Sequence, residues 1–450
     1  MPCMEPATLE SGGENTPEIL LREAIALSSA PRGAAPVFRL TRERTLTRRG
    51  VIWLGQTCNA RCQFCYFIRS VEDRNDPKHA FMPYEKAKAI CRTMVDTFGN
   101  NAVDIEGGEP TLWHHIPELV AYCKSIGLAP TIITNGIVLD SKERLLTLKD
   151  AGVRDFLVSV LGLGPVHDAA VGVQGAHRRQ MQALANMTSL GMPFRFNCVM
   201  TKQVIPHLPV VAKLAIATGA RVVNFLAYNP FFDQAGGERR RKEHVASYSE
   251  IKPLLAEALD ILAAAHVEGN ARYLPFCAVE SRHWRSVYDF QQLSYDPHEA
   301  DLSTQMWTAL PLQMISAEPL SPPVAFSHLL RPTPVPPTIS RLVRWKYVRA
   351  MVFGLHRALV KIASKKYATR EQGYRAIGRH FAKRTGYDFC PSCQACALKR
   401  ICDGVPSAYV HMYGWTELSP VKSIATTDDP CHFARAQEKV VEEEVPVCVP

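Results

Sequence analysis

The sequence predicts an α/β fold built around a parallel sheet. From about residue 51, apolar runs alternate with helix-like stretches, and each run ends in a polar or glycine-rich turn. The runs begin about 25 to 50 residues apart, which leaves room for one helix in each crossover. They are also almost continuously apolar, as strands covered on both faces should be. In such a fold, ligands bind at the C-terminal ends of the strands.

The predicted elements follow one another in alternation. Six strands are expected at 51–57, 102–107, 130–136, 155–160, 193–200 and 220–228. Helices are expected at 83–98, 115–126, 141–151, 174–190 and 207–218. Another helix is predicted at 247–266, because Ser247-Tyr-Ser-Glu250 has the form of a capping box and apolar residues recur at helical spacing. A short strand at 271–276 then leads to Cys277.

The chain of 450 residues is long enough for two or three domains, and 47% of its residues are hydrophobic, so a large core is expected. An N-terminal extension, partly disordered, includes a helix near 20–27 and a strand leading in. The βα core and a bridge carrying Cys277 follow, then a proline-rich linker with a basic helical insertion, and finally a cysteine-rich region with a tail. The expected boundaries are 1–48, 49–230, 231–300, 301–389 and 390–450.

The net charge of +9 is concentrated in one segment. Residues 338–385 contain 13 Lys and Arg but a single acid, Glu371, so the rest of the chain is slightly acidic. This segment is either a solvated helical cover for the core or a basic face for an acidic electron-donor protein, a partner enzyme or an anionic surface. We expect no nucleic acid partner, because no recognition motif accompanies the charge.

The N-terminus has no apolar segment that could act as a signal peptide, and no apolar stretch approaches the 18 residues of a membrane span. Seven of the 14 cysteines form two tight groups, which is unlike a small disulfide-stapled protein. We therefore expect a reducing, cytoplasmic location. The isolated residues Cys91, Cys123 and Cys198 are expected to be buried small hydrophobic groups.

The first cysteine group is Cys58, Cys62 and Cys65, spaced C-x3-C-x2-C directly after the first strand. Three thiolates at this spacing can hold three irons of a four-iron cluster and leave the fourth iron open. The alternative is zinc, but structural zinc takes four ligands, usually as two pairs. A second motif, Glu106-Gly-Gly-Glu109-Pro110, ends the next strand. Its glycines would let a ligand approach the backbone, and Glu109 could hold an ammonium group.

Together, Cys58-x3-Cys62-x-Phe64-Cys65 and Gly107-Gly108-Glu109-Pro110 resemble the radical S-adenosylmethionine (SAM) superfamily over roughly residues 49–230. The resemblance implies a partial (β/α)6 barrel with a [4Fe-4S] cluster bound by three cysteines and SAM. It further implies one-electron cleavage of SAM to a 5′-deoxyadenosyl radical, supplied with electrons by a flavodoxin- or ferredoxin-like donor.

The same resemblance implies roles for residues around the mouth of the barrel. Cys58, Cys62 and Cys65 would bind the cluster, and Phe64 would lie by the adenine. Gly107, Gly108 and Glu109 would receive the methionyl amine. Ribose and carboxylate contacts, or simply structural polar roles, would fall to Asn135, Ser159 and Asn197.

The second cysteine group is Cys390-x2-Cys393-x2-Cys396-x5-Cys402. Zinc is the alternative ligand here too, but the spacing resembles part of the SPASM/twitch extension that carries auxiliary clusters. That resemblance implies one auxiliary [4Fe-4S] cluster bound by Cys277, Cys393, Cys396 and Cys402, with Cys390 as the alternative fourth ligand. The final C-x3-C step of the full SPASM pattern is absent, because position 406 is proline.

Asp104 and Glu106 lie two apart on the second predicted strand and so share a face. If that face lines the barrel, they could bind a cationic substrate or transfer a proton; otherwise they are salt-bridged structural acids.

Three classes of function remain open. The first is radical modification of a small polar substrate, by a lyase or oxidoreductase that could work with a downstream reductase. In length and cluster layout the chain is similar to the dehydratases that initiate 3′-deoxygenation of aminoglycosides such as paromamine, in antibiotic biosynthesis. The others are a SPASM/twitch-type peptide maturase or alcohol dehydrogenase, and a non-enzymatic iron–sulfur sensor or assembly protein.

Overall fold

The computed structural model describes most of the chain. The described residues are 16–29, 38–41, 49–98, 100–230, 241–289, 292, 387–427, 429–430 and 432–442. The proline-rich linker, the basic segment 338–385, Cys431 and Cys448 lie outside these ranges.

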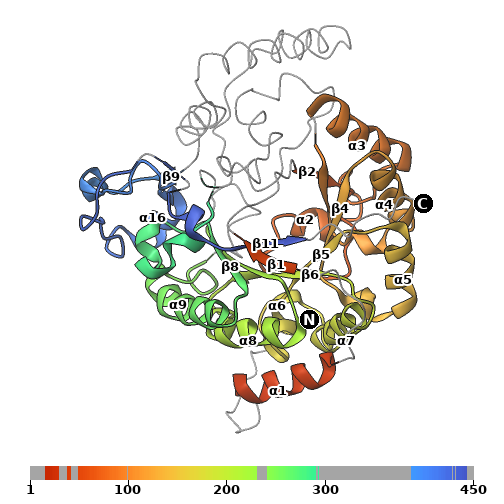
Figure 1. Cartoon of the computed structure of the whole chain (residues 1–450), viewed down its shortest axis with the longest axis horizontal. Coiled ribbons are helices and arrows are strands. Elements are labelled where there is room, and N and C mark those ends of the chain that lie inside the picture. Colours follow the sequence, from red (N-terminus) through yellow and green to blue (C-terminus); the bar gives the residue numbers. More distant parts are fainter. Residues whose placement is uncertain are drawn as a thin grey trace, which may run out of the picture.

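Seven parallel strands form one curved sheet, in which the order of the strands follows the order of the chain. Each crossover therefore adds the next strand at the growing edge, and the helices lie in an arc outside the strands (Figure 1). The strands are β2 Arg49–Trp53, β3 Ala102–Glu106, β4 Ala129–Thr134, β5 Asp155–Ser159, β6 Phe194–Met200, β7 Val222–Ala227 and β8 Glu268–Arg272. This is the half-barrel of the predicted α/β class, with one strand more than the six expected. The predicted strand at 271–276 is displaced: it is β8, it begins at Glu268, and it belongs to the main sheet.

The predicted crossover helices are present. They are α3 Tyr84–Phe98, α4 Ile116–Ser125, α5 Lys142–Ala151, α7 Ala176–Ser189, α8 Leu208–Thr218 and α9 Tyr248–Ala264. The capping box expected at Ser247 starts α9, with the Ser247 and Glu250 side chains each satisfying a backbone N–H of the other residue. Two short helices, α2 Ile68–Glu72 and α6 Pro165–Val171, were not predicted.

The outer face of the sheet packs on these helices, so the inner face lines a lumen. A β carbon on Gly50 of β2 would lie 2.8 Å from the sulfur of Met94 on α3. A β carbon on Gly269 of β8 would lie 2.8 Å from a methyl group of Leu259 on α9. Because side chains alternate along a strand, the neighbours of these glycines point inward. Residues such as Trp53 and Arg272 therefore face the lumen, where they are only partly buried.

The N-terminal extension contains the expected helix, α1 Pro17–Ser28, whose buried Leu20, Leu21 and Ala24 belong to the core cluster. The expected strand, β1 Phe38–Thr41, does not join the parallel sheet. It pairs antiparallel with β11 Lys439–Glu442, so two segments that are far apart in the sequence lie side by side (Figure 1).

The cysteine-rich region packs against the β8 side of the barrel. It contains β9 Tyr387–Asp388 paired with β10 Val405–Pro406, followed by α16 Ser407–Tyr413. The Tyr409 ring stacks on Tyr248 of α9 with ring centres 3.9 Å apart, and its hydroxyl accepts the Tyr248 backbone N–H. Among the described residues, every helix is too short or too polar to cross a membrane.

Candidate active site

The cysteine loop and the glycine-rich turn are interlocked at the C-terminal ends of β2 and β3. The backbone N–H of Gly108 donates to the carbonyl of Gly55 (2.7 Å), and that of Glu109 donates to the carbonyl of Thr57 (2.9 Å). A β carbon on Gly108 would lie 2.2 Å from the carbonyl oxygen of Thr57. The turn thus needs glycine because the cysteine loop passes against it, and not only because a ligand must approach.

The three thiols of this loop lie close together and near Glu109. Burial and the neighbouring thiols of Cys65 and Cys58 raise the pKa of Cys62 well above its ordinary value. Burial and the carboxylate of Glu109 raise the pKa of Cys58 to about 12. Electrostatic effects of this kind fall off steeply with distance, so the two sequence motifs meet at one place.

This set of thiols fits an iron–sulfur cluster. The backbone N–H groups of Ala60 and Phe67 donate to the sulfurs of Cys58 and Cys65, each at 3.4 Å. Such donors stabilise thiolate charge and tune a cluster. Metal replaces the proton of each thiol, so a high pKa in the metal-free chain does not prevent binding. In the described part of the chain, no three His, Cys, Asp or Glu side chains lie close enough together to bind a single metal ion. This does not argue against a cluster, because the cysteines of an iron–sulfur cluster bind separate irons and lie farther apart.

Helix α6 supports the cysteine loop. The backbone N–H groups of Arg61 and Gln63 donate to the carbonyls of Val171 and Ala170 at the end of α6 (2.8 and 3.1 Å). Gly172, with φ of +67°, ends the helix and leaves room for the carbonyl of Arg61. Sequence reasoning missed this helix because it is seven residues long, although glycines at both of its ends were a signal.

Two buried histidines hold the loop that leads from β5 into α6. Nδ1 of His167 accepts the N–H of Leu161, and Nδ1 of His207 accepts the N–H of Leu163, both at 3.2 Å. Burial lowers the pKa of His167 to about 3, and burial lowers that of His177, whose ring centre is 5.7 Å away, to about 4. Both rings are therefore neutral at neutral pH.

The free energy of unfolding is expected to fall as the pH decreases from 6.5 towards 4. Histidines in the unfolded chain take up protons near pH 6.5, whereas His167 and His177 in the folded chain stay neutral at that pH. At pH 5 the loss should be about 2 kcal/mol for each histidine. His167→Asn keeps an acceptor for Leu161 and cannot be protonated. Comparison of urea midpoints at pH 7 and pH 5 should show a smaller drop for this variant than for wild type; equal drops would contradict the assignment.

Glu109 connects the ends of β3 and β4. Its buried carboxylate accepts the N–H and hydroxyl of Thr111 (3.1 and 2.6 Å), the hydroxyl of Thr134 (2.8 Å) and the N–H of Asn135 (2.7 Å). Burial raises the pKa of Glu109, and these donors oppose the shift. The carboxylate is therefore held in one position beside the cysteine thiols.

The other predicted SAM contacts lie along the same mouth. Nδ2 of Asn135 donates to Oδ1 of Asn59 (2.8 Å), so this side chain ties β4 to the cysteine loop and is already engaged. Ser159 and Asn197 are paired in register on β5 and β6 and are half-buried on the lumen side. Phe64 is also half-buried and packs on the core.

Asp104 and Glu106 do share the lumen face of β3, in register with Val51 and Trp53 of β2. Asp104 lies 3.6 Å from Nε of Arg49. Glu106 accepts a hydrogen bond from the indole N–H of Trp53, while burial and the charge of Asp104 raise its pKa to about 7. The two carboxyls thus differ: Asp104 lies beside a cation, whereas Glu106 has no cation within ion-pair distance in the described ranges.

Cys277 and the four cysteines of the second group come together beside β8. Cys277 lies on the short turn Phe276–Ala278. Burial first, and then the thiols of Cys396 and Cys390, raise the pKa of Cys277; burial and the Cys277 thiol raise that of Cys402. The sulfurs of Cys390 and Cys393 are 3.0 Å apart. Cysteines separated by more than 100 positions in the sequence therefore form one possible cluster site.

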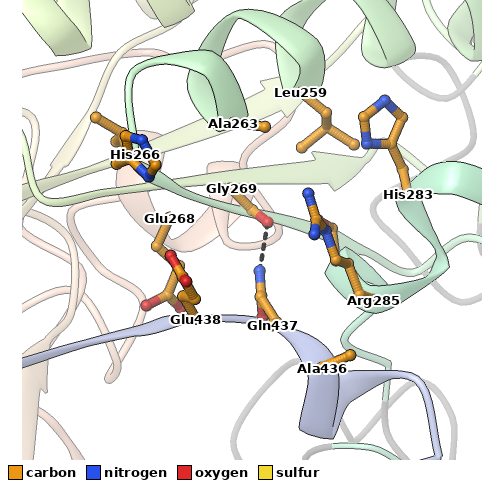
Figure 2. A pocket seen from close by; sticks show the side chains of 12 residues that line it. Leu259, Ala263, His266, Glu268, Gly269, His283, Arg285, Ala436, Gln437 and Glu438 are labelled. Atoms are coloured by element: carbon orange, nitrogen blue, oxygen red, sulfur yellow. Dashed lines mark hydrogen bonds between the residues drawn. The ribbon is translucent and has the colours of Figure 1, made fainter. Parts of the chain in front are cut away.

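A cavity of about 220 Å³ lies elsewhere, where α9 ends and β8 begins. Its lining includes His266, Arg285 and Glu438, and Gln437 covers the strand edge by donating to the carbonyl of Gly269 at 2.7 Å (Figure 2). None of the predicted site residues lines it. It is a cavity at the opposite, N-terminal end of β8.

The residues of the candidate SAM site lie within a match to a known family model. The model of the Radical SAM superfamily matches residues 54–214. Over 166 residues the chain is 29% identical to Fe-coproporphyrin III synthase of Methanosarcina barkeri, covering 36% of this chain and 40% of that protein. Over 181 residues it is 29% identical to PqqA peptide cyclase of Methylocella silvestris, covering 38% and 48%. The chain thus spans less than half the length of these relatives.

Among solved structures, Streptococcus suis SuiB bound to S-adenosylmethionine superposes with a TM-score of 0.43 at 20% identity, covering 50% of this chain and 51% of that one. Methylornithine synthase superposes with a TM-score of 0.38 at 17% identity, covering 59% and 72%. The superfamily uses a [4Fe-4S] cluster and SAM, and the matched residues 54–214 include both the cysteine loop and the glycine-rich turn. The protein therefore carries a radical SAM superfamily domain, which spans residues 54–214.

Proposed function

We propose that the protein is a radical SAM enzyme that removes a hydrogen atom from a polar substrate. The observation that carries this proposal is the interlocking of the Cys58–Cys65 loop with the Gly107–Glu109 turn at the C-terminal ends of parallel strands. When bound there, a cluster with one open iron and SAM would supply a 5′-deoxyadenosyl radical.

The residues around the mouth have separate tasks in this proposal. Cys58, Cys62 and Cys65 hold the cluster. The Gly107–Glu109 turn receives the methionyl amine, with the carboxylate of Glu109 fixed in advance by its four donors. Ser159 and Asn197, adjacent in register on the lumen side, contact the polar groups of SAM. The half-barrel keeps water from the radical.

The substrate enters the lumen between the SAM site and the auxiliary cysteines. Glu106 is the stronger candidate for a substrate contact, either with a cationic group or in proton transfer, because its pKa is raised to about 7 and no cation lies within ion-pair distance of it among the described residues. Asp104 is the weaker candidate because Arg49 faces it. Electrons would come from a flavodoxin- or ferredoxin-like protein in a reducing, cytoplasmic setting.

Two substrate classes are compatible with this site. Dehydration of an aminoglycoside such as paromamine remains a prediction from length and cluster layout. Peptide maturation is a second candidate, favoured by the similarity to PqqA peptide cyclase. An alcohol dehydrogenase reaction would use the same radical step and the same auxiliary cluster.

The experiment that tests the proposal is anaerobic reconstitution with iron, sulfide, SAM and dithionite, followed by chromatography for 5′-deoxyadenosine. We expect slow formation without substrate. A protein that takes up iron but never releases 5′-deoxyadenosine would instead support an iron–sulfur sensor or assembly role.

The auxiliary site is expected to use Cys277, Cys393, Cys396 and Cys402. Cys277→Ser should lower the iron content from about eight to about four per chain, whereas Cys390→Ser should leave it near eight. Iron and sulfide analysis after anaerobic reconstitution measures this. The reverse result, with iron lost only in Cys390→Ser, would make Cys390 the fourth ligand.

A further inference from the structure

Most charges in the lumen of the half-barrel are matched by an opposite charge. Nε of Arg195 lies 2.6 Å from the carboxylate of Asp155, and Nε of Arg49 lies 3.6 Å from that of Asp104. Buried charges without a partner cost several kcal/mol, so such matching is expected.

Two charged side chains at the C-terminal ends of the strands are not matched in this way. Glu106, at the end of β3, accepts a hydrogen bond from Trp53 and faces no cation within ion-pair distance among the described residues. Arg272, at the end of β8, has no carboxylate within that distance in the described ranges, and its buried Nε has no hydrogen-bond partner there. One group is an acid and the other a base, and they stand near opposite edges of the sheet.

The two groups nevertheless lie near the same side chain, the phenol of Tyr273. Burial raises the pKa of Tyr273 to about 12; the guanidinium of Arg272 opposes this shift and the carboxylate of Glu106 adds to it. Burial raises the pKa of the nearby acid Asp289, and the guanidinium of Arg272 opposes this shift. Oδ1 of Asp289 accepts the backbone N–H of Tyr273, and this carboxylate forms no ion pair with Arg272. Glu106 and Arg272 thus both lie near Tyr273, and both are at C-terminal strand ends on the lumen face of the sheet.

We propose that Glu106 and Arg272 bind the ammonium and the carboxylate of one substrate, which is therefore an amino acid or a peptide. Arginine binds carboxylate in a planar, two-point geometry, and each partner would remove the cost of an unpaired charge. An aminoglycoside supplies ammonium groups but no carboxylate. This inference rests on the proposed radical SAM activity and names the substrate class of that site.

SAM itself carries an ammonium and a carboxylate group, but it is assigned to a different place. Its amine is expected at the Gly107–Glu109 turn, which lies against the cysteine loop. Arg272, at the end of β8, is none of the residues expected to hold SAM. We therefore expect loss of Arg272 to affect the substrate and to leave SAM binding unchanged.

The test uses the reconstituted full chain with SAM and dithionite and measures the rate of 5′-deoxyadenosine formation. One arm adds the mixed free amino acids, a second adds a tryptic digest of casein, and a third adds paromamine. We expect the first or second arm, which separate amino acid from peptide, to raise the rate at least fivefold. Arg272→Gln should raise at least tenfold the substrate concentration that gives half of this rate increase. Arg272→Lys, which keeps the positive charge, should need a concentration between those of wild type and Arg272→Gln. The control Arg285→Gln, at an exposed surface position, should behave as wild type.

The outcomes separate this inference from the proposed function. If no 5′-deoxyadenosine forms under any condition, the proposed function is wrong. If 5′-deoxyadenosine forms only at the background rate with both the amino acids and the peptide digest, the substrate class is wrong. The same conclusion follows if paromamine alone raises the rate. Arg272→Gln with normal iron content but at least tenfold weaker SAM binding would place SAM at Arg272 and overturn the inference as well.

Discussion

Cys62→Ala should abolish 5′-deoxyadenosine formation and remove about four of about eight irons. Burial first, and then the neighbouring thiols of Cys65 and Cys58, raise the pKa of Cys62. With two thiolates left, a cubic cluster would have two irons without protein ligands and would be lost. Iron analysis and chromatography of the reaction measure the two effects separately.

The matched control is Cys198→Ala, because Cys198 is a fully buried thiol on β6 that belongs to neither cysteine group. This variant should keep about eight irons and wild-type activity. Retention of activity in Cys62→Ala would contradict the assignment, whereas equal losses in both variants would point to a general loss of folding.

Glu109→Gln should weaken SAM binding by roughly tenfold or more and loosen the cysteine loop. The carboxylate accepts three donors at Oε1 and the N–H of Asn135 at Oε2. An amide has one acceptor oxygen, so its NH2 group would face either Asn135 or the threonines. A buried mismatch of this kind costs about 1–3 kcal/mol.

Isothermal titration with SAM on the reconstituted protein measures the change in affinity. Glu118→Gln is the control, because Glu118 is exposed on α4 and its partner, His115, is a surface residue. Unchanged SAM affinity in Glu109→Gln would show that this carboxylate does not take part in SAM binding.

The parallel sheet could be predicted from the sequence because its strands are apolar runs with helices between them. The cysteine and glycine motifs could be placed in one mouth because each follows directly after a strand. Their interlocking could not be predicted, since the contact of Gly108 with Thr57 depends on the path of two loops in space. The seventh strand was misplaced because Glu268-Gly-Asn-Ala-Arg272 is mostly polar on its lumen face and carries no apolar run.

Long-range pairing accounts for the other features that sequence reasoning missed. Nothing in the local pattern of 38–41 indicates that this strand pairs with 439–442 rather than with the main sheet. Arg272 was passed over for the same reason, because a single arginine has no motif around it. Its proposed role emerges only when the charges at the strand ends are compared, because Glu106 and Arg272 have no opposite charge within ion-pair distance among the described residues.

The most direct test of the central claim is the electron paramagnetic resonance spectrum of the reduced protein before and after SAM is added. It should be recorded on Cys402→Ala, which is expected to keep only the cluster of Cys58, Cys62 and Cys65. A spectrum that shifts when SAM is added is the predicted result, because SAM would bind the open iron. A spectrum that stays the same at saturating SAM would contradict the claim that this cluster is the SAM site.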